Sequence, residues 1–593
     1  MTKSKTADDG KEKQSADQGW RETVESIAMA IILALLFRGF VAEAFVIPTG
    51  SMAPTLQGRH KDVACPKCGK WYQASASDEI NRDGSASGAT VVSTTCSVCR
   101  YTQTLDLASE PNDASFSGDR IIVGKFAYDL ADPRRWDVIV FKFPHDAREN
   151  YIKRLVFLPN ETGRIVGGNV YATTTGIEDD LRICRKPPHK LDAMLQIVDD
   201  TDFIAPELTA LGWPSRWGQR TQAEAATKAA WKTDDGGRSF VCDGTAAGDA
   251  VLRYRHLVPS PQDWHVIETQ NKLPAGVAER RGELIADYYA YNAKHSIDRS
   301  SYHPDDSKLP DPQTFGVHWV DDLAVECLAD VTGNQGDLLI DLVRAGVRYQ
   351  CRINVADGKA KLTARDHDGT QLKFGDIGEP EVAEPTAQTA VKGPGSYRLR
   401  LSNCDHEVLL WVNGSVVKFD GPTTYDTGEL PDPLWTPTNF GDLEPAGIGS
   451  RACAARISQL RIFRDKYYIA LDESSGDNDY IQEFYCEKNY GNSPSNRYLE
   501  QIARIQEILA DPDKWSTTEL FNSRRDAQFQ LDKDHFFPMG DNSPHSYDAR
   551  LWNTPQSVKR DLLIGKALMI YWPHTWNRPV PFTPNFSRMG RIR

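Results

Sequence analysis

The 593-residue sequence lacks a basic excess, an internal repeat and a glycine-rich loop of the kind that cradles phosphate. Asp and Glu outnumber Lys and Arg by 82 to 69, the formal net charge is -13, and no lysine-rich block occurs. A DNA- or RNA-binding surface needs basic charge to neutralise phosphates, so the composition argues against a nucleic-acid partner. The hydrophobic content of 40% and charged content of 25% are typical of a globular protein of several domains.

Long hydrophobic runs are also scarce. The most apolar run, 27–37, is shorter than the roughly 20 residues that a membrane-spanning helix needs, and it reaches that length only if it extends to Phe45. Lysines precede it, so the positive-inside rule predicts a cytoplasmic, disordered tail over 1–19 and a single transmembrane anchor over 20–45. The alternative is a cleaved signal peptide, because the Ala-Glu-Ala sequence at 42–44 fits a small-x-small cleavage site.

A serine and a lysine have suggestive surroundings. Ser51 lies in FVIPTGSMAPT at 45–55, directly after the apolar run. A serine hydroxyl becomes a nucleophile when a base takes its proton, and an unprotonated lysine can be that base. Lys153 lies among apolar residues in YIKRLVFLP at 151–159, and burial lowers the pKa of a lysine by disfavouring its ammonium form. Taken singly, each residue is more simply a surface hydroxyl or a solvated strand lysine.

Four stretches occur in a fixed order along the chain. They are PTGSMAPT at 48–55, GDRIIVGKF at 118–126, YIKRLVFLP at 151–159 and GDNSPHSYDAR at 540–550. In this order they resemble the four sequence boxes of bacterial type I signal peptidases, a family that also has its membrane anchor just ahead of the first box. The resemblance covers residues 20–60, 117–175 and 530–575.

The resemblance implies a reaction and two catalytic residues. Ser51 would be the acylated nucleophile and Lys153 the general base. The Thr49 hydroxyl and the Ser51 backbone N–H would form the oxyanion hole. The expected substrates are secretory preproteins cleaved after small-x-small sites, by an enzyme of the inner (plasma) membrane whose catalytic domain faces away from the cytoplasm. Lipid is then an expected partner, and no cofactor is expected for catalysis.

The resemblance also implies supporting roles. Ser546 would orient the lysine amine, the pair Asp548 and Arg550 would shape the site, and Tyr151 with Ile152 would pair with the bound peptide.

The sequence departs from the family pattern at two places. Phe157 and Asn160 stand where the family usually has glycines, so the chain after Lys153 is expected to turn differently. Ser543, Pro544 and His545 replace a usual basic and acidic pair, and His545 is interpreted as a solvated loop residue rather than a catalytic base.

Four cysteines form a separate motif. ACPKCGK at 64–70 and TCSVCRY at 95–101 are two CxxC knuckles that contribute Cys65, Cys68, Cys96 and Cys99. This spacing predicts a zinc ribbon with a structural zinc ion and no open coordination position. The alternative is two disulfides, because the segment is expected to face an oxidising compartment.

A long insertion separates the third and fourth boxes. Its part 315–465 alternates apolar and polar residues, as in DLAVEC at 322–327 and SYRLRLSN at 396–403, and EVLLWVNGSVVKF at 407–419 has an Asn-Gly hairpin turn. With QLRIFRD at 459–465, this pattern resembles a concanavalin-like or laminin-G jelly roll. A carbohydrate or protein ligand is one interpretation, and a spacer is another.

A helical stripe follows at 497–513. Leu499, Ile502, Ile505, Ile508 and Leu509 recur at helical spacing, and Pro512 follows its end.

The predicted fold is mainly β with an N-terminal transmembrane helix, its signal-peptidase-type β core split by a zinc ribbon and a β-sandwich. After the tail and anchor, the expected parts are core residues 46–62, the zinc ribbon 63–104, core residues 117–175, a mixed insertion 176–314, the sandwich 315–465, a connecting segment with a helix 466–529, and core residues 530–593.

Two functional alternatives belong to other classes. One is an inactive, membrane-anchored adhesion or scaffold protein that uses the lectin-like domain, although both Ser51 and Lys153 are present. The other is a self-cleaving repressor-type regulator, which would carry a DNA-binding module that the sequence does not show.

Overall fold

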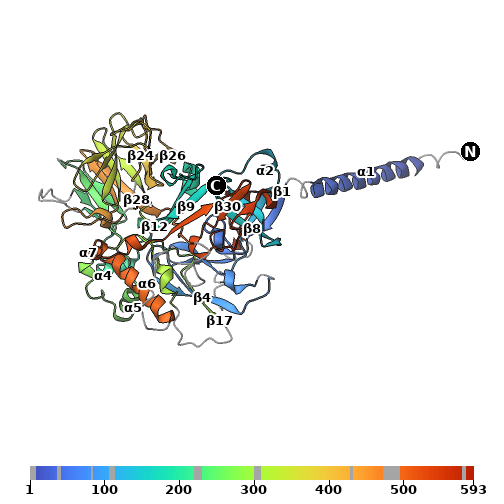
Figure 1. Ribbon diagram of the computed structural model, residues 1–593, viewed down its shortest axis with the longest axis horizontal. Helices are drawn as coiled ribbons and strands as arrows, with labels where there is room; N and C mark the ends of the chain where they lie inside the picture. The colour runs from blue at the N-terminus through green and yellow to red at the C-terminus, as the bar shows by residue number, and fades with distance from the viewer. Residues whose placement is uncertain are drawn as a thin grey trace, which may run out of the picture.

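The structure is a computed structural model in which a long N-terminal helix extends away from a β-rich body (Figure 1). It describes residues 9–36, 42–81, 84–105, 114–219, 230–246, 248–298, 309–427, 430, 432–471, 494–576 and 583–593.

The core sheet combines strands from distant parts of the sequence. Its order is β1-β6-β32-β7-β8-β30-β31, and β35 pairs with β32. The bounds are β1 Ala42–Val46, β6 Arg120–Gly124, β7 Val138–Phe143, β8 Asp146–Phe157, β30 His535–Met539, β31 Val558–Lys559, β32 Leu563–Trp572 and β35 Gly590–Arg591. Because β30 to β35 follow the insertion, the last part of the chain completes a sheet that the first part begins.

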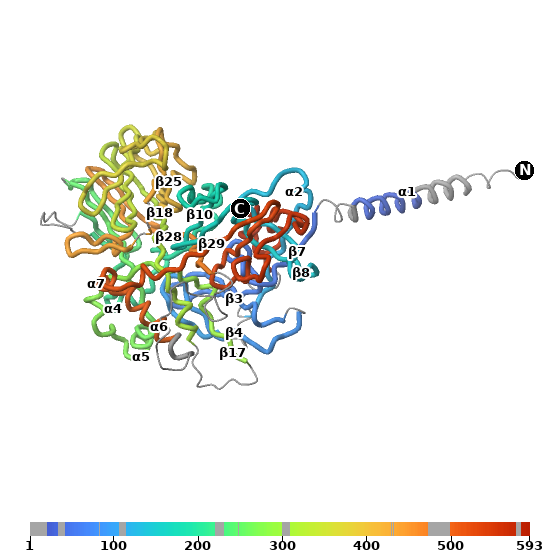
Figure 2. The backbone as a smooth tube through the Cα atoms, in the orientation of Figure 1, coloured from blue at the N-terminus to red at the C-terminus, as the bar shows by residue number. Residues whose placement is uncertain are grey.

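A smaller sheet and three short ribbons surround the core sheet. One four-stranded sheet runs β11 Arg182–Ile183, β10 Asn169–Thr173, β9 Thr162–Val166 and β29 Asp526–Gln530. The ribbons are β2 His60–Ala64 with β3 Trp71–Ser75, β17 Lys294–Asp298 with β4 Ala89–Thr95 and β5 Thr102–Thr104, and β33 Thr575–Trp576 with β34 Thr583–Pro584. In Figure 2, β3, β4 and β17 lie below the core sheet.

Two large sheets share one hydrophobic core at the far side of the body. The first contains β12 Gln196–Asp200, β14 Trp231–Lys232, β15 Ser239–Cys242, β18 Leu323–Val331, β24 Gly395–Cys404, β25 Glu407–Val412, β26 Ser415–Val416 and β28 Ala455–Arg464. The second contains β13 Trp217–Gln219, β16 Ala250–Tyr254, β19 Asp337–Arg344, β20 Val347–Asn354, β21 Lys359–Arg365, β22 Gln371–Leu372, β23 Thr386–Gln388 and β27 Ala446–Arg451. Strands from 196–254 therefore belong to the sandwich, although the sequence analysis separated 176–314 from 315–465.

Local predictions within the sandwich are confirmed. The predicted hairpin is β25 paired with β26, and both turn residues have positive φ, 52° at Asn413 and 79° at Gly414. Such values suit Asn-Gly, which reaches the left-handed region at low cost. The lectin or laminin-G relationship and its ligand stay predictions.

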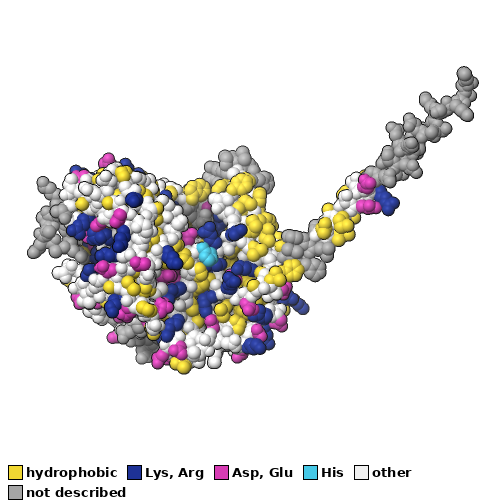
Figure 3. Space-filling model, turned by 90° about the horizontal axis from the view of Figure 1, so that it is seen from above, with side chains coloured by type: hydrophobic (Ala, Val, Ile, Leu, Met, Phe, Trp, Pro, Cys, Tyr) yellow, Lys and Arg dark blue, Asp and Glu magenta, His cyan; other side chains and the backbone are white. Residues whose placement is uncertain are grey.

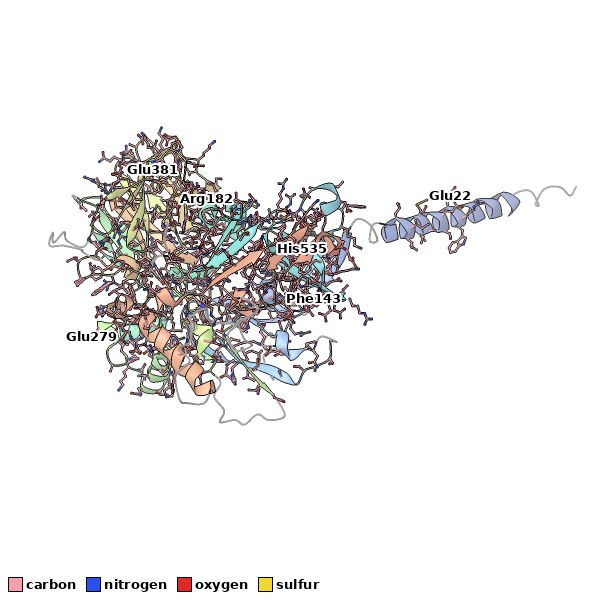
Figure 4. All side chains as sticks on the ribbon, viewed as in Figure 1. Glu22, Phe143, Arg182, Glu279, Glu381 and His535 are labelled. Carbon is pink, nitrogen blue, oxygen red and sulfur yellow. The ribbon has the colours of Figure 1, made fainter. Side chains whose placement is uncertain are left out.

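Seven α-helices are described. They are α1 Asp9–Leu36, α2 Ala127–Leu130, α3 Pro188–Met194, α4 Pro206–Leu211, α5 Pro261–Gln270, α6 Pro494–Ala510 and α7 Pro512–Trp515. The stripe on α6 packs into a core with Leu284 and Val317, and four of its five predicted residues are buried. Leu499 is 45% exposed and lies outside that core. Figure 4 shows the separation of the parts, with Phe143 and His535 on the core sheet and Glu381 at the far end of the sandwich.

The predicted transmembrane helix over 20–45 is wrong. Within the described part of the chain, no helix combines the length and the apolar character that crossing a bilayer requires. The prediction needed the apolar run to continue as helix to Phe45, but Ala42–Val46 is strand β1, paired with β6. The first half of α1 is also rich in charged and polar residues. The predicted location stays a prediction.

Hydrophobic side chains nonetheless lie exposed along the second half of α1, and Figure 3 shows them as a yellow patch on the helix.

Candidate active site

The predicted nucleophile lies on a short 3-10 turn between β1 and β2. The turn, η2 Gly50–Met52, is buried, and Thr49 before it has extended backbone (φ -116°, ψ 158°). Met52 packs into a small core with Ile121 and Val138 of the core sheet. The apolar residues around Ser51 therefore fix the turn against the sheet.

Lys153 reaches this turn from the neighbouring strand β8. Its Nζ lies 2.7 Å from Ser51 Oγ, although 102 residues separate the two. Ser51 is 8% exposed and Lys153 is 5% exposed. Burial lowers the pKa of Lys153 to about 8, with Asp548 opposing and Arg550 reinforcing that shift. A neutral amine at this distance can accept the proton of the serine hydroxyl.

The loop after β30 closes over the pair. Gly540 approaches so closely that a Cβ there would lie 2.5 Å from the Ser51 carbonyl oxygen and 2.1 Å from Ser546 Oγ. Arg550 donates two hydrogen bonds to Asp548, of 2.8 and 2.9 Å, and the Gly540 N–H donates to Asp548 at 2.9 Å. Burial opposes ionisation of Asp548, but Arg550 and these donors outweigh it and lower its pKa. The predicted charged pair thus shapes the loop.

Two of the predicted roles are not shown by any hydrogen bond among the described residues. Among the described residues, no hydrogen bond joins Ser546 Oγ to the Lys153 amine, although Ser546 is buried in the same loop. Thr49 is exposed beside Ser51, and its side chain does not cap the turn. Both residues lie near the pair, but their predicted roles stay predictions.

The predicted substrate-binding residues lie on β8 just before Lys153. Tyr151 and Ile152 pair with Phe141 and Val140 of β7, and the ladder with β30 begins only at Arg154. Tyr151 stacks on Phe143, with ring centroids 4.5 Å apart. The aromatic pair gives this end of β8 a rigid, half-buried surface.

A buried ion pair next to the dyad was missed by the sequence analysis. Arg154 donates to Asp541 at 2.6 and 2.7 Å, and both side chains are fully buried. Thr55 Oγ1 also donates to Asp541, at 2.5 Å. The pair joins β8, the turn after Ser51 and the loop after β30. Arg154 lies in the stretch at 151–159 and Asp541 in the stretch at 540–550. Their positions directly after Lys153 and Gly540 are the sequence feature that could have indicated this ion pair.

The departures from the family pattern have local explanations. Asn160 takes the left-handed conformation (φ 64°), which asparagine tolerates better than other non-glycine residues, so it can replace a glycine there. Phe157 packs into the core with Phe537, at a centroid distance of 5.3 Å. His545 is exposed, as the sequence analysis expected.

The four motif cysteines converge in the ribbon region. All four Sγ atoms lie within 4.8 Å of one another, and the contacts Cys65–Cys99 (3.4 Å) and Cys68–Cys96 (3.6 Å) join the two knuckles. A disulfide would need about 2.05 Å, whereas the edge of a tetrahedron with Zn–S bonds of about 2.3 Å is about 3.8 Å. The donor set therefore fits a tetrahedral zinc ion.

Comparisons with known proteins agree with the geometry. A family model described as signal peptidase, peptidase S26, matches residues 20–70, 89–195 and 473–572, which leaves most of the insertion outside the match. The probable signal peptidase I-2 of Synechocystis sp. is 27% identical over 34% of this chain and 68% of its own length. The signal peptidase I of Pseudomonas aeruginosa is 33% identical over 18% of this chain and 41% of its own length.

Sheep galectin-11 is a similar solved structure, with 14% identity over 24% of this chain and 90% of its own. Its TM-score of 0.16 is too low to support an argument. The family match and the names of the relatives support a serine peptidase hydrolase of the signal peptidase type.

Proposed function

We propose that this protein is an endopeptidase that removes signal peptides from secretory preproteins, with Ser51 as nucleophile and Lys153 as general base. The observation that carries the proposal is the 2.7 Å contact between Ser51 Oγ and Lys153 Nζ in a buried site. The family match and the relatives named signal peptidase support the substrate class.

The proposed reaction proceeds through an acyl-enzyme. Ser51 Oγ attacks the carbonyl after the small-x-small sequence while Lys153 takes the hydroxyl proton. The Ser51 backbone N–H and the Thr49 hydroxyl stabilise the oxyanion, each donor in such a site being worth about 3 to 4 kcal/mol. Lys153 passes the proton to the leaving amine and then activates the water that releases the acyl group. Low exposure of the pair supports this role for the lysine, because burial lowers the pKa of the amine to about 8 and so raises its neutral fraction.

We also propose a structural zinc ion held by Cys65, Cys68, Cys96 and Cys99. The converging thiols support it. When bound, zinc would supply a covalent link between the two knuckles, while the peptidase residues act without it.

The test of the peptidase proposal compares Ser51→Ala and Lys153→Ala with wild type on a preprotein that carries a small-x-small site. Each substitution is expected to lower the initial cleavage rate by more than about 10³-fold. Lys142→Ala is the matched control, since Lys142 is an exposed lysine on the adjacent strand β7. Cleavage at the normal rate by either dyad variant would exclude the Ser-Lys mechanism.

A further inference from the structure

A loop of the insertion reaches the candidate active site. The loop, residues 288–293 and here named the strap, lies between the sandwich strand β16 and strand β17, and its sequence YYAYNA belongs to none of the four boxes. Tyr288 and residues 290 to 293 are buried. The strap therefore packs inside the body and is not a solvent-exposed loop.

Asn292 of the strap forms a reciprocal amide pair with Asn542 of the loop after β30. Asn292 Nδ2 donates to Asn542 Oδ1 and Asn542 Nδ2 donates to Asn292 Oδ1, both at 2.8 Å. The two side chains are 6% and 2% exposed. A buried amide uses its donors and its acceptor, so each residue fixes the rotation of the other.

Asn542 in turn holds the nucleophile turn. Its backbone N–H donates to the Ser51 carbonyl at 3.0 Å, and its side-chain N–H donates to the Gly50 carbonyl at 3.1 Å. The amide of Asn542 therefore has one hydrogen available for Gly50 and one for Asn292. If the amide rotated, the Gly50 bond would be lost together with the Asn292 pair.

The neighbouring strap residue contacts the same turn. A Cβ on Gly50 would lie 2.4 Å from the Tyr291 ring, so the ring occupies the space that a side chain at position 50 would need. The turn ahead of Ser51 is thus enclosed by Asn542 through hydrogen bonds and by Tyr291 through packing.

The strap is anchored on the ribbon region. The Thr95 N–H donates to the Ala293 carbonyl at 3.0 Å, and the Ser75 N–H donates to the Tyr291 carbonyl at 2.7 Å. The Tyr288 hydroxyl donates to the Cys96 carbonyl at 3.0 Å. These bonds fix both ends of the strap, so the ribbon region helps to set the position of Asn292.

We infer that Asn292 is a positioning residue of the peptidase site, through which the insertion completes the alignment of Ser51 with Lys153. The inference rests on the proposed peptidase function. Asn292 touches neither reacting group; it acts on Asn542, and Asn542 acts on the carbonyls of Gly50 and Ser51. A displacement of a reacting group by about 1 Å can lower a rate by about 10²-fold.

The experiment measures kcat and KM of Asn292→Ala and Asn292→Asp on the same preprotein. For Asn292→Ala we expect kcat to fall by about 10- to 100-fold, with KM within about threefold of wild type. An ionised aspartate accepts hydrogen bonds but donates none, so Asn292→Asp keeps one bond of the pair and loses the other. Asn292→Asp is therefore expected to fold, and its kcat is also expected to fall below the wild-type value.

Asn403→Ala is the matched control. Asn403 is a buried asparagine of the insertion, on β24, and its Oδ1 accepts a hydrogen bond from Tyr425 of the sandwich core. We expect this variant to keep the wild-type kcat. Equal losses of kcat in Asn403→Ala and Asn292→Ala would overturn the inference, because both would then reflect general destabilisation.

Amide hydrogen exchange gives a readout that does not need peptidase activity. In Asn292→Ala and Asn292→Asp, exchange is expected to become faster in peptides covering 50–56 and 540–546, and to stay unchanged there in Asn403→Ala. If Ser51→Ala abolishes cleavage but Asn292→Ala keeps both the wild-type kcat and the wild-type exchange, the inference fails and the peptidase proposal stands. If the wild-type protein cleaves no preprotein, the peptidase proposal fails. Faster exchange in the Asn292 variants would then still show that Asn292 holds the two segments in place, and unchanged exchange would exclude that contact.

Discussion

At the scale of single residues, the site depends on the protonation state of Lys153. A lysine in water is almost fully protonated at pH 7, because its usual pKa is about 10.4, and an ammonium group cannot take a proton from serine. In this structure the ammonium form is disfavoured because Lys153 is buried, and the negative charge of Asp548 offsets that effect only in part. In the proposed mechanism, the pair of Ser51 and Lys153 therefore becomes competent when Lys153 loses a proton.

This gives a pH prediction. Since burial lowers the pKa of Lys153 to about 8, kcat/KM is expected to rise from pH 7 to pH 9 with a midpoint near 8. The sign is fixed by the mechanism, because activity is present above the pKa and is lost as pH falls through it. A rate profile of wild type and Lys142→Ala on one preprotein measures this, and both are expected to share the midpoint. A flat profile over this interval would contradict the assignment of Lys153 as the base.

The same shift affects stability. Lys153 binds its proton more tightly in the unfolded chain, where its pKa has the ordinary value of about 10.5, than in the folded protein. Its contribution to the free energy of unfolding is therefore expected to rise with pH between about 8 and 10.5.

The sequence predicted the dyad better than its surroundings. Ser51 and Lys153 are adjacent in space because their boxes fold onto one sheet, and the resemblance carried that information. Asn292 gave no signal, since an asparagine in an insertion is ordinary until its partner is known. Ser546 was predicted to contact the amine, but its hydroxyl lies against Gly540 instead, a matter of side-chain rotation that a sequence pattern does not determine.

At the scale of elements, no described strand pairing joins β3 and β4. The Tyr72 and Thr94 hydroxyls share a hydrogen bond of 2.8 Å, and the thiols of the two knuckles approach to 3.4 and 3.6 Å. Both knuckles also pack in one hydrophobic core with Trp264 and Tyr288. A bound metal would add a further link between the knuckles, because the free energy of binding becomes free energy of folding.

A metal assay tests this element. We expect one zinc ion per chain, and four additional reactive thiols after chelation. Cys99→Ser is expected to lose the zinc, whereas Cys351→Ser, at a buried cysteine of the sandwich, keeps it. Because the strap is bonded to Thr95 and Cys96, chelation is also expected to lower kcat. A metal-free protein with two disulfides would rule out the zinc site.

The prediction of helices and strands failed where pairing with a distant segment decides whether a stretch forms a helix or a strand. The apolar run before Ser51 was extended through Phe45 as one helix, but Ala42–Val46 pairs with β6 and forms the edge of the core sheet. Alternation within strands and the Asn-Gly turn are local signals, and they predicted the sandwich hairpin correctly. The membership of β12 to β16 in the sandwich required long-range pairing that no local pattern contains.

At the scale of the whole molecule, the segment that follows β11 is attached to the sandwich through buried charge. Lys186, which follows β11, donates to Asp405 at 2.6 Å and contacts Asp465 at 2.8 Å. Asp405 lies in the turn between β24 and β25, and Asp465 directly follows β28. Asp322 lies with them, all three carboxylates within 4.8 Å of one another. Burial raises the pKa of Asp322 well above its usual value, with Asp321 adding to the shift.

Lys186→Met tests this junction. The substitution keeps the length of the side chain but leaves buried carboxylates without their cation, so the free energy of unfolding is expected to fall by about 3 to 5 kcal/mol. Lys361→Met is the control, because Lys361 pairs with Glu384 at the surface and such pairs contribute about 1 kcal/mol or less. Denaturant unfolding, with amide exchange at residues 465–469, measures both variants. The deficit of Lys186→Met in the free energy of unfolding should shrink towards pH 5, since protonation removes the uncompensated charge. A loss no larger than that of Lys361→Met would show that this junction does not hold the segment after β11 to the sandwich.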